Sequence, residues 1–335
     1  MGFEPQFTIT SRLLAVSEDI AVLRERIQSA AIKLSWVPAL QKDSRSRNVH
    51  ASTAIEGNPL TLEQVRAIEE GRTLAASDDR SEREVLNYFA GLRYVEKNAA
   101  KKTLRHEDIF TLHRILAEGV MDQGDAGRYR TIAVRVGNYF PPAAGDVSGL
   151  IMELLDWWNK ESVKLSPVIS SAILHHRFES IHPFADGNGR TGRALALWEL
   201  YRRGFDTHHI FSVDEFYWKD RPRYYTALDA VRRDGDDLTT WLEYSAEGLH
   251  NTLERVWIRV QAFQPESGKK LVLRPKQEQL LRLLSDHASM SPTEIWAAIN
   301  ISRQGAMDLL HPLIEAGFVE KIGGKKTGRY SLRKQ

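Results

Sequence analysis

The residues in this sequence whose types and spacing could do chemistry are concentrated in residues 182–193, which read HPFADGNGRTGR. This segment contains a histidine, an aspartate, one glycine on each side of Asn188 and two arginines that are three positions apart. It runs directly into residues 194–200, ALALWEL, which are strong helix formers without a breaker. The glycine-rich loop is therefore expected to open a helix. The start of a helix presents unpaired N–H groups and the positive end of the helix dipole, and both favour an anion.

The charged residues of this segment are suited to a nucleotide phosphate. Arg190 and Arg193 are placed in the first helical turn, from which guanidinium groups can bind anionic oxygens in a bidentate way. Asp186 offers a hard oxygen ligand for a magnesium ion that is shared with phosphates. His182 has an ordinary pKa near working pH and can accept a proton from an attacking hydroxyl. Each fragment alone is typical of a turn, a loop or a solvated helix face, but the complete order predicts a phosphate site with its own base.

The segment matches, without a gap, the HPFx(D/E)GNGRxxR signature of the Fic family, and the chain resembles Fic-domain proteins. The resemblance extends through residues 173–181, ILHHRFESI, and through residues 127–142. The resemblance covers roughly the middle half of the chain. Every position of the signature is occupied by the expected residue type.

The resemblance implies a protein adenylyltransferase, an enzyme that moves AMP from ATP to a Ser, Thr or Tyr hydroxyl of a target protein or of its own chain. It implies that His182 is the base and that Asp186 holds Mg²⁺ between the α- and β-phosphates. The backbone of residues 187–189 would form an anion hole, and Arg190 and Arg193 would bind the outer phosphates. Tyr224 is expected to stack on the adenine, because a flat aromatic side chain suits a purine. The residues expected to contact the nucleotide are therefore Gly187, Asn188, Gly189, Arg190, Thr191, Gly192, Arg193 and Tyr224.

A second short segment, residues 52–58, reads STAIEGN and is typical of a helix end that is stopped by a glycine. Taken alone, it predicts a capped helix terminus with an exposed Glu56. The inhibitory helix of the Fic family carries the same pattern, and its glutamate pairs with the second arginine of the signature. The resemblance therefore implies a pair between Glu56 and Arg193 that opposes binding of the γ-phosphate. In some members this glutamate also positions a water for removal of AMP, so Glu56 could serve both reactions.

Two other functions remain open from the sequence. One is an ATP-sensing, DNA-binding regulator in which the Fic domain is largely silent. The other is a Fic enzyme that transfers a different nucleotide or a phosphate through the same site.

Composition excludes several classes of protein. The 46 basic and 44 acidic residues give a net charge of +2, which provides no global argument for nucleic acid binding. The absence of cysteine from the 335 residues excludes disulfides, a thiol nucleophile and a thiolate metal site. The first residues lack a signal peptide pattern, and no apolar run reaches membrane-spanning length, so we expect a cytoplasmic protein without membrane contact. Four further histidines have no ligand partners at regular spacing and are expected in loops or the core: His175, His176, His208 and His209.

The hydrophobic pattern predicts a mainly α fold, a Fic-type helical bundle with a β-hairpin flap. Helices are expected over 11–42 (one or two), from 61 and from 81, over 106–120, 147–160, 166–180 and 190–203, and around 224–228 and 241–244. Residues 131–140 alternate β-branched residues with others around a Gly-Asn turn, which predicts the hairpin. By resemblance, this flap docks a segment of the target protein by main-chain pairing near His182.

The C-terminal part is predicted to be a winged helix-turn-helix domain. The expected domains are an N-terminal helical region with the inhibitory motif (1–100), a Fic catalytic domain (101–262), a linker (263–275) and the winged helix (276–335). If the domain binds DNA, Arg303 and Gln304 are suited to base contacts, and Lys325, Lys326 and Arg329 are suited to phosphate contacts. Protein contacts are the alternative use of such a domain. A second copy of the chain is a further candidate partner.

Overall fold

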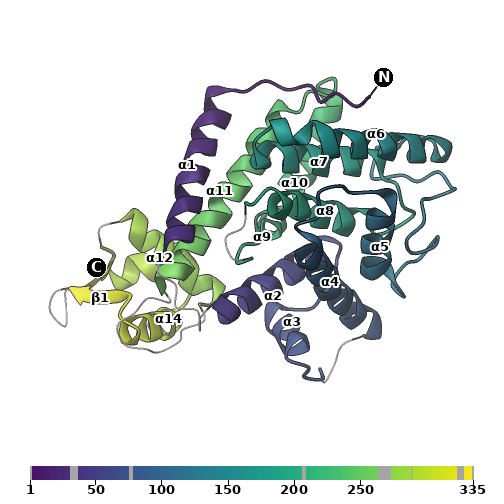
Figure 1. The fold of residues 1–335 in the computed structure, drawn as a ribbon. Helices are drawn as coiled ribbons and strands as arrows, with labels where there is room; N and C mark the ends of the chain where they lie inside the picture. The colour runs from purple at the N-terminus through teal and green to yellow at the C-terminus, as the bar shows by residue number, and fades with distance from the viewer. Residues whose placement is uncertain are drawn as a thin grey trace. The chain divides into compact units, whose positions relative to one another are not determined.

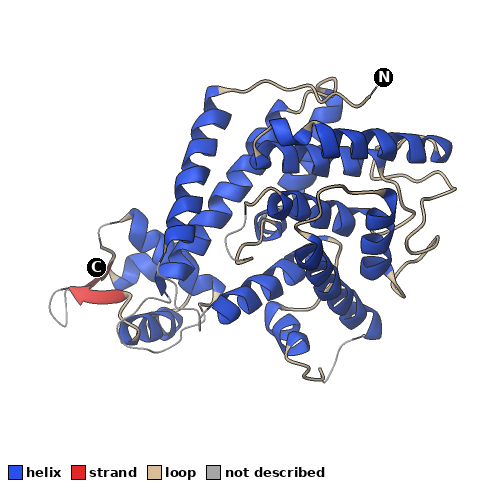
Figure 2. Ribbon diagram, viewed as in Figure 1, coloured by secondary structure: helices blue, strands red, loops and turns tan. Residues whose placement is uncertain are grey.

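The computed structural model of the chain describes residues 2–30, 37–74, 78–205, 209–262, 273–287, 289–322 and 328–333. The chain divides into two compact units. The first unit contains Met1–Arg24 and Gln41–Thr252, and the second contains Glu25–Leu40 and Leu253–Gln335. Helices dominate both (Figures 1 and 2), which confirms the expected mainly α fold.

Most helices up to residue 262 match the expected ones, but the helix Asp214–Lys219 was not expected, and the helix that begins at Val37 continues to Ile55, past the expected end at residue 42. Their bounds are α1 (Ser11–Ser29), α2 (Val37–Ile55), α3 (Leu62–Glu69), α4 (Asp79–Asn98), α5 (His106–Ala117), α6 (Val147–Lys160), α7 (Pro167–Ile181), α8 (Asn188–Arg202), α9 (Asp214–Lys219), α10 (Arg221–Arg233) and α11 (Thr239–Ala262). Two short 3₁₀ turns, η1 (Ala144–Asp146) and η2 (Ser162–Lys164), flank α6.

Local capping explains several of these boundaries. Thr61 accepts a hydrogen bond from the backbone of Gln64, whose side chain accepts one from the backbone of Thr61, so that α3 begins with a capping box. Ser166 caps α7 ahead of a proline at its first position. These contacts satisfy N–H groups that a helix start leaves unpaired.

The helices α7 and α8 form the centre of the first unit (Figure 1), with α6 packed against α7 and with α4 and α5 packed against α8. A Cβ atom at Gly192 of α8 would lie 2.3 Å from Oε1 of Glu179 and 3.2 Å from Cδ1 of Phe178, both on α7. Glycine at this position therefore allows the two helices to approach closely. The loop between them, residues 182–187, is fixed at both ends by buried helices.

The expected β-hairpin over residues 131–140 is limited to a single bridged turn. Val136 and Tyr139 exchange two backbone hydrogen bonds of 3.0 and 2.9 Å around Gly137, which has a φ of 57°. No ladder extends from this bridge within residues 131–140. The side chain of Arg130 donates to the carbonyls of Ile132 and Pro142, which occupies acceptors that a strand partner would need, and the two prolines at 141–142 have no N–H to donate.

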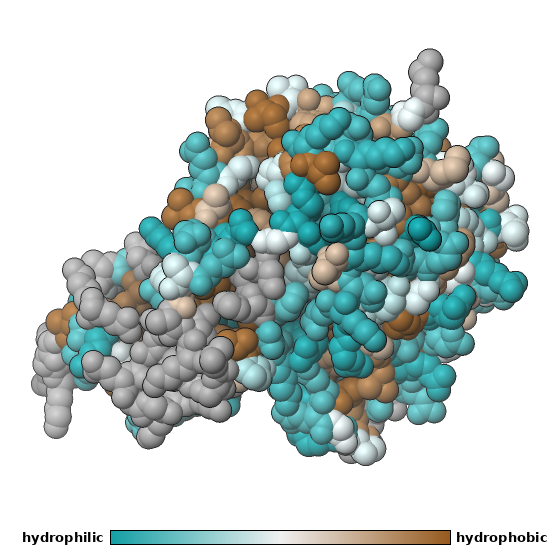
Figure 3. Space-filling model, in the orientation of Figure 1, coloured by the Kyte–Doolittle hydropathy of each residue, from teal (hydrophilic) through white to brown (hydrophobic). Residues whose placement is uncertain are grey.

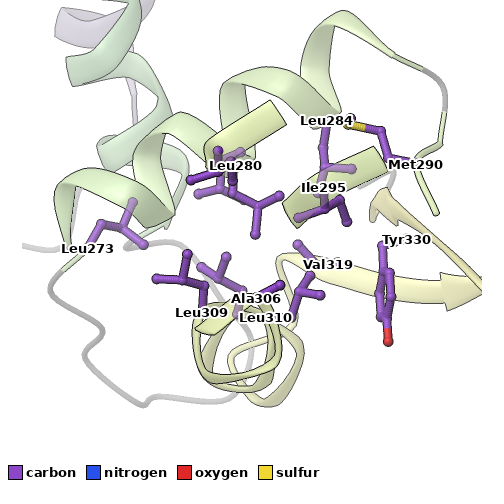
Figure 4. Packing of buried hydrophobic residues seen from close by; sticks show 13 residues of the cluster. Leu273, Leu280, Leu284, Met290, Ile295, Ala306, Leu309, Leu310, Val319 and Tyr330 are labelled. Atoms are coloured by element: carbon purple, nitrogen blue, oxygen red, sulfur yellow. The ribbon is translucent and has the colours of Figure 1, made fainter. Parts of the chain in front are cut away.

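The second unit contains the helices α12 (Pro275–Asp286), α13 (Pro292–Ile299) and α14 (Arg303–Glu315) and the strands β1 (Val319–Ile322) and β2 (Arg329–Leu332). The strands pair in antiparallel register, with Val319 opposite Leu332. Figure 4 shows side chains from all five elements that meet in one core: Leu280, Leu284, Ile295, Ala306, Leu309, Leu310, Val319 and Tyr330 among them. Lys325 and Lys326 and most of the expected linker, residues 263–272, lie outside the described residues.

The surface of the first unit that is visible in Figure 3 is mainly hydrophilic, and its hydrophobic areas are separated from one another. Among the described helices, none has both the length and the apolar character that crossing a bilayer requires.

Candidate active site

His182 is held at the end of α7 by its backbone. Its φ of 49° and ψ of 61° lie in the left-handed region, which is uncommon for a residue other than glycine. Its N–H donates to the carbonyl of Phe178 at 2.9 Å, and its carbonyl accepts from Nε of Arg130 at 2.8 Å. These two contacts maintain the turn and therefore the position of the imidazole.

The imidazole of His182 is neutral at physiological pH. Burial disfavours the charged ring and lowers its pKa to about 4. A neutral imidazole has a lone pair that can accept a proton, which is the property required of a general base.

The loop after His182 is closed by Asn188. Its side chain accepts from the backbone N–H of Phe184 and donates to the carbonyl of the same residue, both at 2.9 Å. At 2 % exposure, the Asn188 side chain is committed to holding the loop. The donors that this position offers to an anion are therefore backbone N–H groups.

His113 of α5 supports the same loop and was not identified from the sequence. Its Nδ1 accepts from the N–H of Gly127 at 2.8 Å, so Nε2 carries the hydrogen that it donates to the carbonyl of Asp186 at 2.9 Å. Its ring stacks on Phe184 with centroids 3.6 Å apart. Burial lowers the pKa of His113 to about 4, which keeps the ring in this neutral form.

The start of α8 presents its first N–H groups at the end of the loop. Gly187 has a φ of 76°, and Oγ1 of Thr191 donates to the Gly187 carbonyl at 2.8 Å. The N–H groups of residues 188–190 belong to the first turn and have no acceptor within the helix. Thr191 is completely buried and Gly192 packs on α7, so both shape the helix start and contribute no side-chain group to a ligand.

Arg190 carries buried donors without partners. It is 4 % exposed, and neither its Nε nor its NH1 has a hydrogen-bond partner. Its nearest carboxylates, those of Glu84 and Asp186, are each 3.9 Å away. Buried unpaired donors are costly, and an anion would satisfy these.

Asp186 is the one signature carboxylate that could bind a metal. It is 34 % exposed, and its Oδ1 accepts from the N–H of Gly187 at 2.5 Å. The described residues contain no group of three or more candidate metal-ligand side chains. This arrangement does not form a cage of its own, but it fits Mg²⁺, which is often bound by one carboxylate together with phosphates and waters.

Glu56 and Arg193 form the expected ion pair, with Oε1 of Glu56 at 2.7 Å from NH2 of Arg193. The Arg193 side chain is 1 % exposed and also donates to Oγ and to the carbonyl of Ser52 at 2.8 and 2.9 Å. Burial would raise the pKa of Glu56, but the charge and hydrogen bond of Arg193 outweigh it, so the net pKa is lowered. Glu56 is therefore an ionised carboxylate at neutral pH.

Gly189 makes room for this pair. A Cβ atom at this position would lie 2.3 Å from Oε1 of Glu56 and 3.1 Å from NH1 of Arg193. The glycine of the helix start thus lets the carboxylate approach the same N–H groups that are available to an anion.

A cleft of about 610 Å³ opens beside these groups. It is lined by side chains of α2, α7, α8 and α10 and by the bridged turn: Glu56, Glu179, His182, Arg193, Tyr225, Asp229, Arg232 and Asn138 among them. A cavity of this size accommodates a ligand as large as a nucleotide.

The structure does not favour Tyr224 as the residue that stacks on a base. It is 1 % exposed, its ring lies 4.7 Å from that of Tyr217, and its hydroxyl contacts Nε2 of His175 at 3.1 Å. The sequence pattern did not distinguish this core position from its neighbour. Tyr224 and Tyr225 both line the cleft, but Tyr225 is 39 % exposed and so presents the more open aromatic surface. His175 and His176 are buried, and His208 lies outside the described residues.

Comparison with known proteins gives a consistent result. Residues 103–200 match the model of the Fic/DOC family. The chain is 29 % identical over 269 residues to protein adenylyltransferase Fic of Drosophila virilis. The aligned region covers 79 % of this chain and 53 % of that relative. The chain is also 34 % identical over 212 residues to protein adenylyltransferase fic-1 of Caenorhabditis elegans. Here the aligned region covers 62 % of this chain and 40 % of that relative. The chain thus spans about half the length of the curated relatives it matches.

Solved structures show the same likeness. A Fic family protein from Desulfovibrio desulfuricans aligns with a TM-score of 0.68 and 26 % identity over 99 % of each chain. Fic-1 from C. elegans aligns with a TM-score of 0.63 and 26 % identity over 73 % of this chain and 72 % of that one. Together with the intact signature at the start of α8, these matches establish that the chain contains a Fic/DOC family domain.

Proposed function

We propose that this chain transfers AMP from ATP to a Ser, Thr or Tyr hydroxyl of a target protein. The observation that carries the proposal is the neutral imidazole of His182 beside the helix start where Arg190 has unpaired buried donors. The names of the relatives support AMP as the transferred group.

In the proposed reaction, the hydroxyl oxygen attacks the α-phosphorus of ATP. The new O–P bond forms as the bond from the α-phosphorus to the bridging oxygen breaks, and pyrophosphate leaves with that electron pair. His182 accepts the hydroxyl proton. Such transfers depend mainly on positioning and on stabilisation of charge, and little on covalent participation by the enzyme.

The remaining signature residues would hold the phosphates. The N–H groups of residues 188–190 and the guanidinium of Arg190 would bind phosphate oxygens, and Arg193 would bind the outer phosphate once Glu56 has left it. Asp186 would hold Mg²⁺, which supplies positive charge between phosphate groups. Tyr225 is our candidate for contact with the base, in place of Tyr224.

Glu56 would restrain this reaction. Its carboxylate occupies the Arg193 guanidinium at 2.7 Å and would repel the γ-phosphate. If the protein also removes AMP from a modified target, Glu56 is the candidate to orient the attacking water, because it is an ionised acceptor in the cleft.

The transferred group is identified by incubating the chain and a lysate with labelled nucleotides. We expect protein-bound label from α-labelled ATP in the presence of Mg²⁺, and loss of that label with EDTA. Label from γ-labelled ATP or from UTP above that in lysate without the chain would indicate transfer of phosphate or UMP. Absence of label from every nucleotide with Glu56→Gly, in which the restraint by Glu56 is removed, would contradict transferase activity.

We propose that residues 276–335 of the second unit form a winged helix-turn-helix domain that makes protein contacts. Its element order and its β1–β2 pair support the fold. The exposed stripe of α14 carries two carboxylates. Arg329, which was expected to contact phosphate, instead donates to the carboxylate of Glu294 at 2.9 Å. The residues of that stripe are Gln304, Asp308, His311 and Glu315. Carboxylates on the helix that would enter the major groove oppose DNA binding. Salt-dependent binding of random duplex DNA by the full chain would contradict this proposal.

A further inference from the structure

Glu179 of α7 is a buried carboxyl group in the cleft that the proposed reaction does not use. The residue is 8 % exposed, and its Oε1 is buried without a hydrogen-bond partner. Its Oε2 lies 3.8 Å from Nδ1 of His182, which is also buried and makes no hydrogen bond of normal geometry, and the backbone of Glu179 acts on the same ring and raises its pKa against the effect of burial. The buried carboxyl group of Glu179 therefore faces a buried ring nitrogen of the proposed base.

The surrounding elements leave a space for this carboxyl group. Gly192 of α8 provides it, since a Cβ atom there would lie 2.3 Å from Oε1 of Glu179. The ionisable groups that face Glu179 are Arg193 of α8, Glu56 just after α2, Arg232 and Tyr224 of α10, and His182 itself. Burial is the largest influence on Glu179 and raises its pKa to about 7, with Arg193 lowering it and Glu56 raising it.

We propose that Glu179 is a positioning residue for His182: its carboxylate orients the imidazole through Nδ1 and stabilises the imidazolium that forms during transfer. This inference rests on the proposed function, in which His182 is the base. A carboxylate beside Nδ1 favours the tautomer that carries its hydrogen on Nδ1. The lone pair then lies on Nε2, at the other edge of the ring, where it can accept the proton of the attacking hydroxyl.

The proton balance of this step is simple. The hydroxyl proton moves to Nε2 as the O–P bond forms, and the resulting positive ring lies next to the negative Glu179. The ring later returns its proton to solvent. Glu179 itself forms no bond to substrate, and its contribution is the same as that of the carboxylate that orients the histidine in a catalytic triad. The distance of 3.8 Å is longer than a hydrogen bond, as is common in sites without bound substrate.

A consequence is that transfer depends on the ionisation of Glu179. Below neutral pH the carboxyl is protonated and carries no charge to stabilise the imidazolium, so transfer is slow. As pH rises through about 7 the carboxylate forms and the rate increases. Removal of the Glu56 charge eases ionisation of Glu179, so this rise is expected at lower pH in Glu56→Gly.

The test compares Glu56→Gly with Glu56→Gly/Glu179→Gln, because Glu56→Gly relieves the restraint on transfer. We expect kcat to fall about ten- to a hundredfold and the rise near neutral pH to disappear, while KM for ATP stays within about twofold. Glu56→Gly/Glu179→Asp should retain the rise, since it keeps a carboxyl group. Glu56→Gly/Glu161→Gln, which changes an exposed glutamate after α6, should match the parent.

A second readout does not depend on any transfer. We expect the ring signals of His182 in NMR spectra of the nucleotide-free wild-type chain to shift as Glu179 titrates near neutral pH. This step should be absent from Glu179→Gln, with His182→Asn identifying the signals.

If Glu179→Gln does not fold, the NMR titration of wild type and Glu179→Asp decides the question. If no variant transfers AMP, the proposed function fails, and the NMR titration still tests the Glu179–His182 pair. An unchanged pH profile and unchanged His182 titration in Glu179→Gln would overturn the inference.

Discussion

The carboxylate of Glu56 lies 2.7 Å from NH2 of Arg193, and that guanidinium is also held by Ser52 of α2. While Glu56 is in place, Glu56 and Ser52 take up hydrogen bonds of the Arg193 guanidinium, and the side chains of Asp214 and Tyr224 lie against it as well. Residues 188–190 open α8 next to this pair. The guanidinium of Arg193, which would bind the outer phosphate, is therefore occupied by Glu56 of the same chain.

Replacing Glu56 by glycine should increase AMP transfer, including self-modification. The change removes a competitor for Arg193 and a negative charge beside the phosphate site. We expect roughly a five- to a hundredfold increase, equivalent to about 1–3 kcal/mol. The rate of label incorporation from α-labelled ATP measures it, with Glu161→Gly as an exposed control. An unchanged or reduced rate would show that Glu56 is an ordinary residue at a helix end.

Replacing Arg190 by methionine should stabilise the nucleotide-free chain and weaken ATP binding. The substitution removes a buried charge whose Nε and NH1 have no partners, and we expect the free energy of unfolding to rise by about 1 kcal/mol. ATP should then no longer raise Tm. Arg202 is a matched control, because it is equally buried but donates to Glu199 and Trp158, so Arg202→Met should destabilise the chain. A lower stability for Arg190→Met would contradict our description of the site.

Replacing Asn188 by alanine should impair transfer by loosening the loop, although every backbone N–H remains. Asn188 makes two hydrogen bonds to Phe184, and Asn159 makes the same two, also at 2.9 Å, to Leu104 outside the cleft. Both alanine variants should lose about 1–3 kcal/mol of stability. Isothermal titration with ATP should show weaker binding for Asn188→Ala alone. Equal ATP binding by both variants would argue against the positioning role of the Asn188 side chain.

The stability of the chain should fall as pH is lowered from 6.5 towards 4. In the folded state burial lowers the pKa of His113, His176 and His182 to about 4 each, below the usual 6.5. The folded chain then binds fewer protons than the unfolded chain in this window, so stability rises with pH there, by about 1.4 kcal/mol for each unit of pKa difference. Glu179 has the opposite sign, because its raised pKa makes stability fall as pH rises from 4.5 to 7.

Urea unfolding between pH 4 and 7 measures this dependence. His176 lies outside the proposed catalytic groups and bonds the carbonyl of Leu228. His176→Gln keeps a donor but cannot ionise in this range, so it should flatten the slope. An identical slope in parent and variant would mean that His176 is not buried as a neutral ring.

Local features of the fold were predictable from the sequence, and long-range ones were not. The start of α8 and the cap of α3 depend on residues within four positions of each other, and both were expected. The contact of Glu56 with Arg193 spans 137 positions and was inferred only through family resemblance. His113 and Glu179 could not be identified, because their roles depend on which helices pack together. Helical periodicity alone likewise did not separate the buried Tyr224 from the exposed Tyr225, and the choice between them as the contact for a base stays a prediction.

The hairpin prediction shows how a side chain can alter a local pattern. Alternation over 131–140 favoured two strands, but the side chain of Arg130 donates to backbone carbonyls on both sides of the turn, among them those of His182, Ile132 and Pro142. Those bonds replace a strand ladder and also fix the carbonyl of the proposed base.

The most direct test of the account is mass spectrometry of Glu56→Gly incubated with ATP and Mg²⁺, beside Glu56→Gly/His182→Ala. We predict a mass increase of one AMP on a hydroxyl side chain of Glu56→Gly, and its absence from the double variant, which should still bind ATP because the imidazole acts on the hydroxyl. Transfer by the double variant within about tenfold of its parent would contradict the assignment of His182 as the base. An added group other than AMP would contradict the proposed reaction itself.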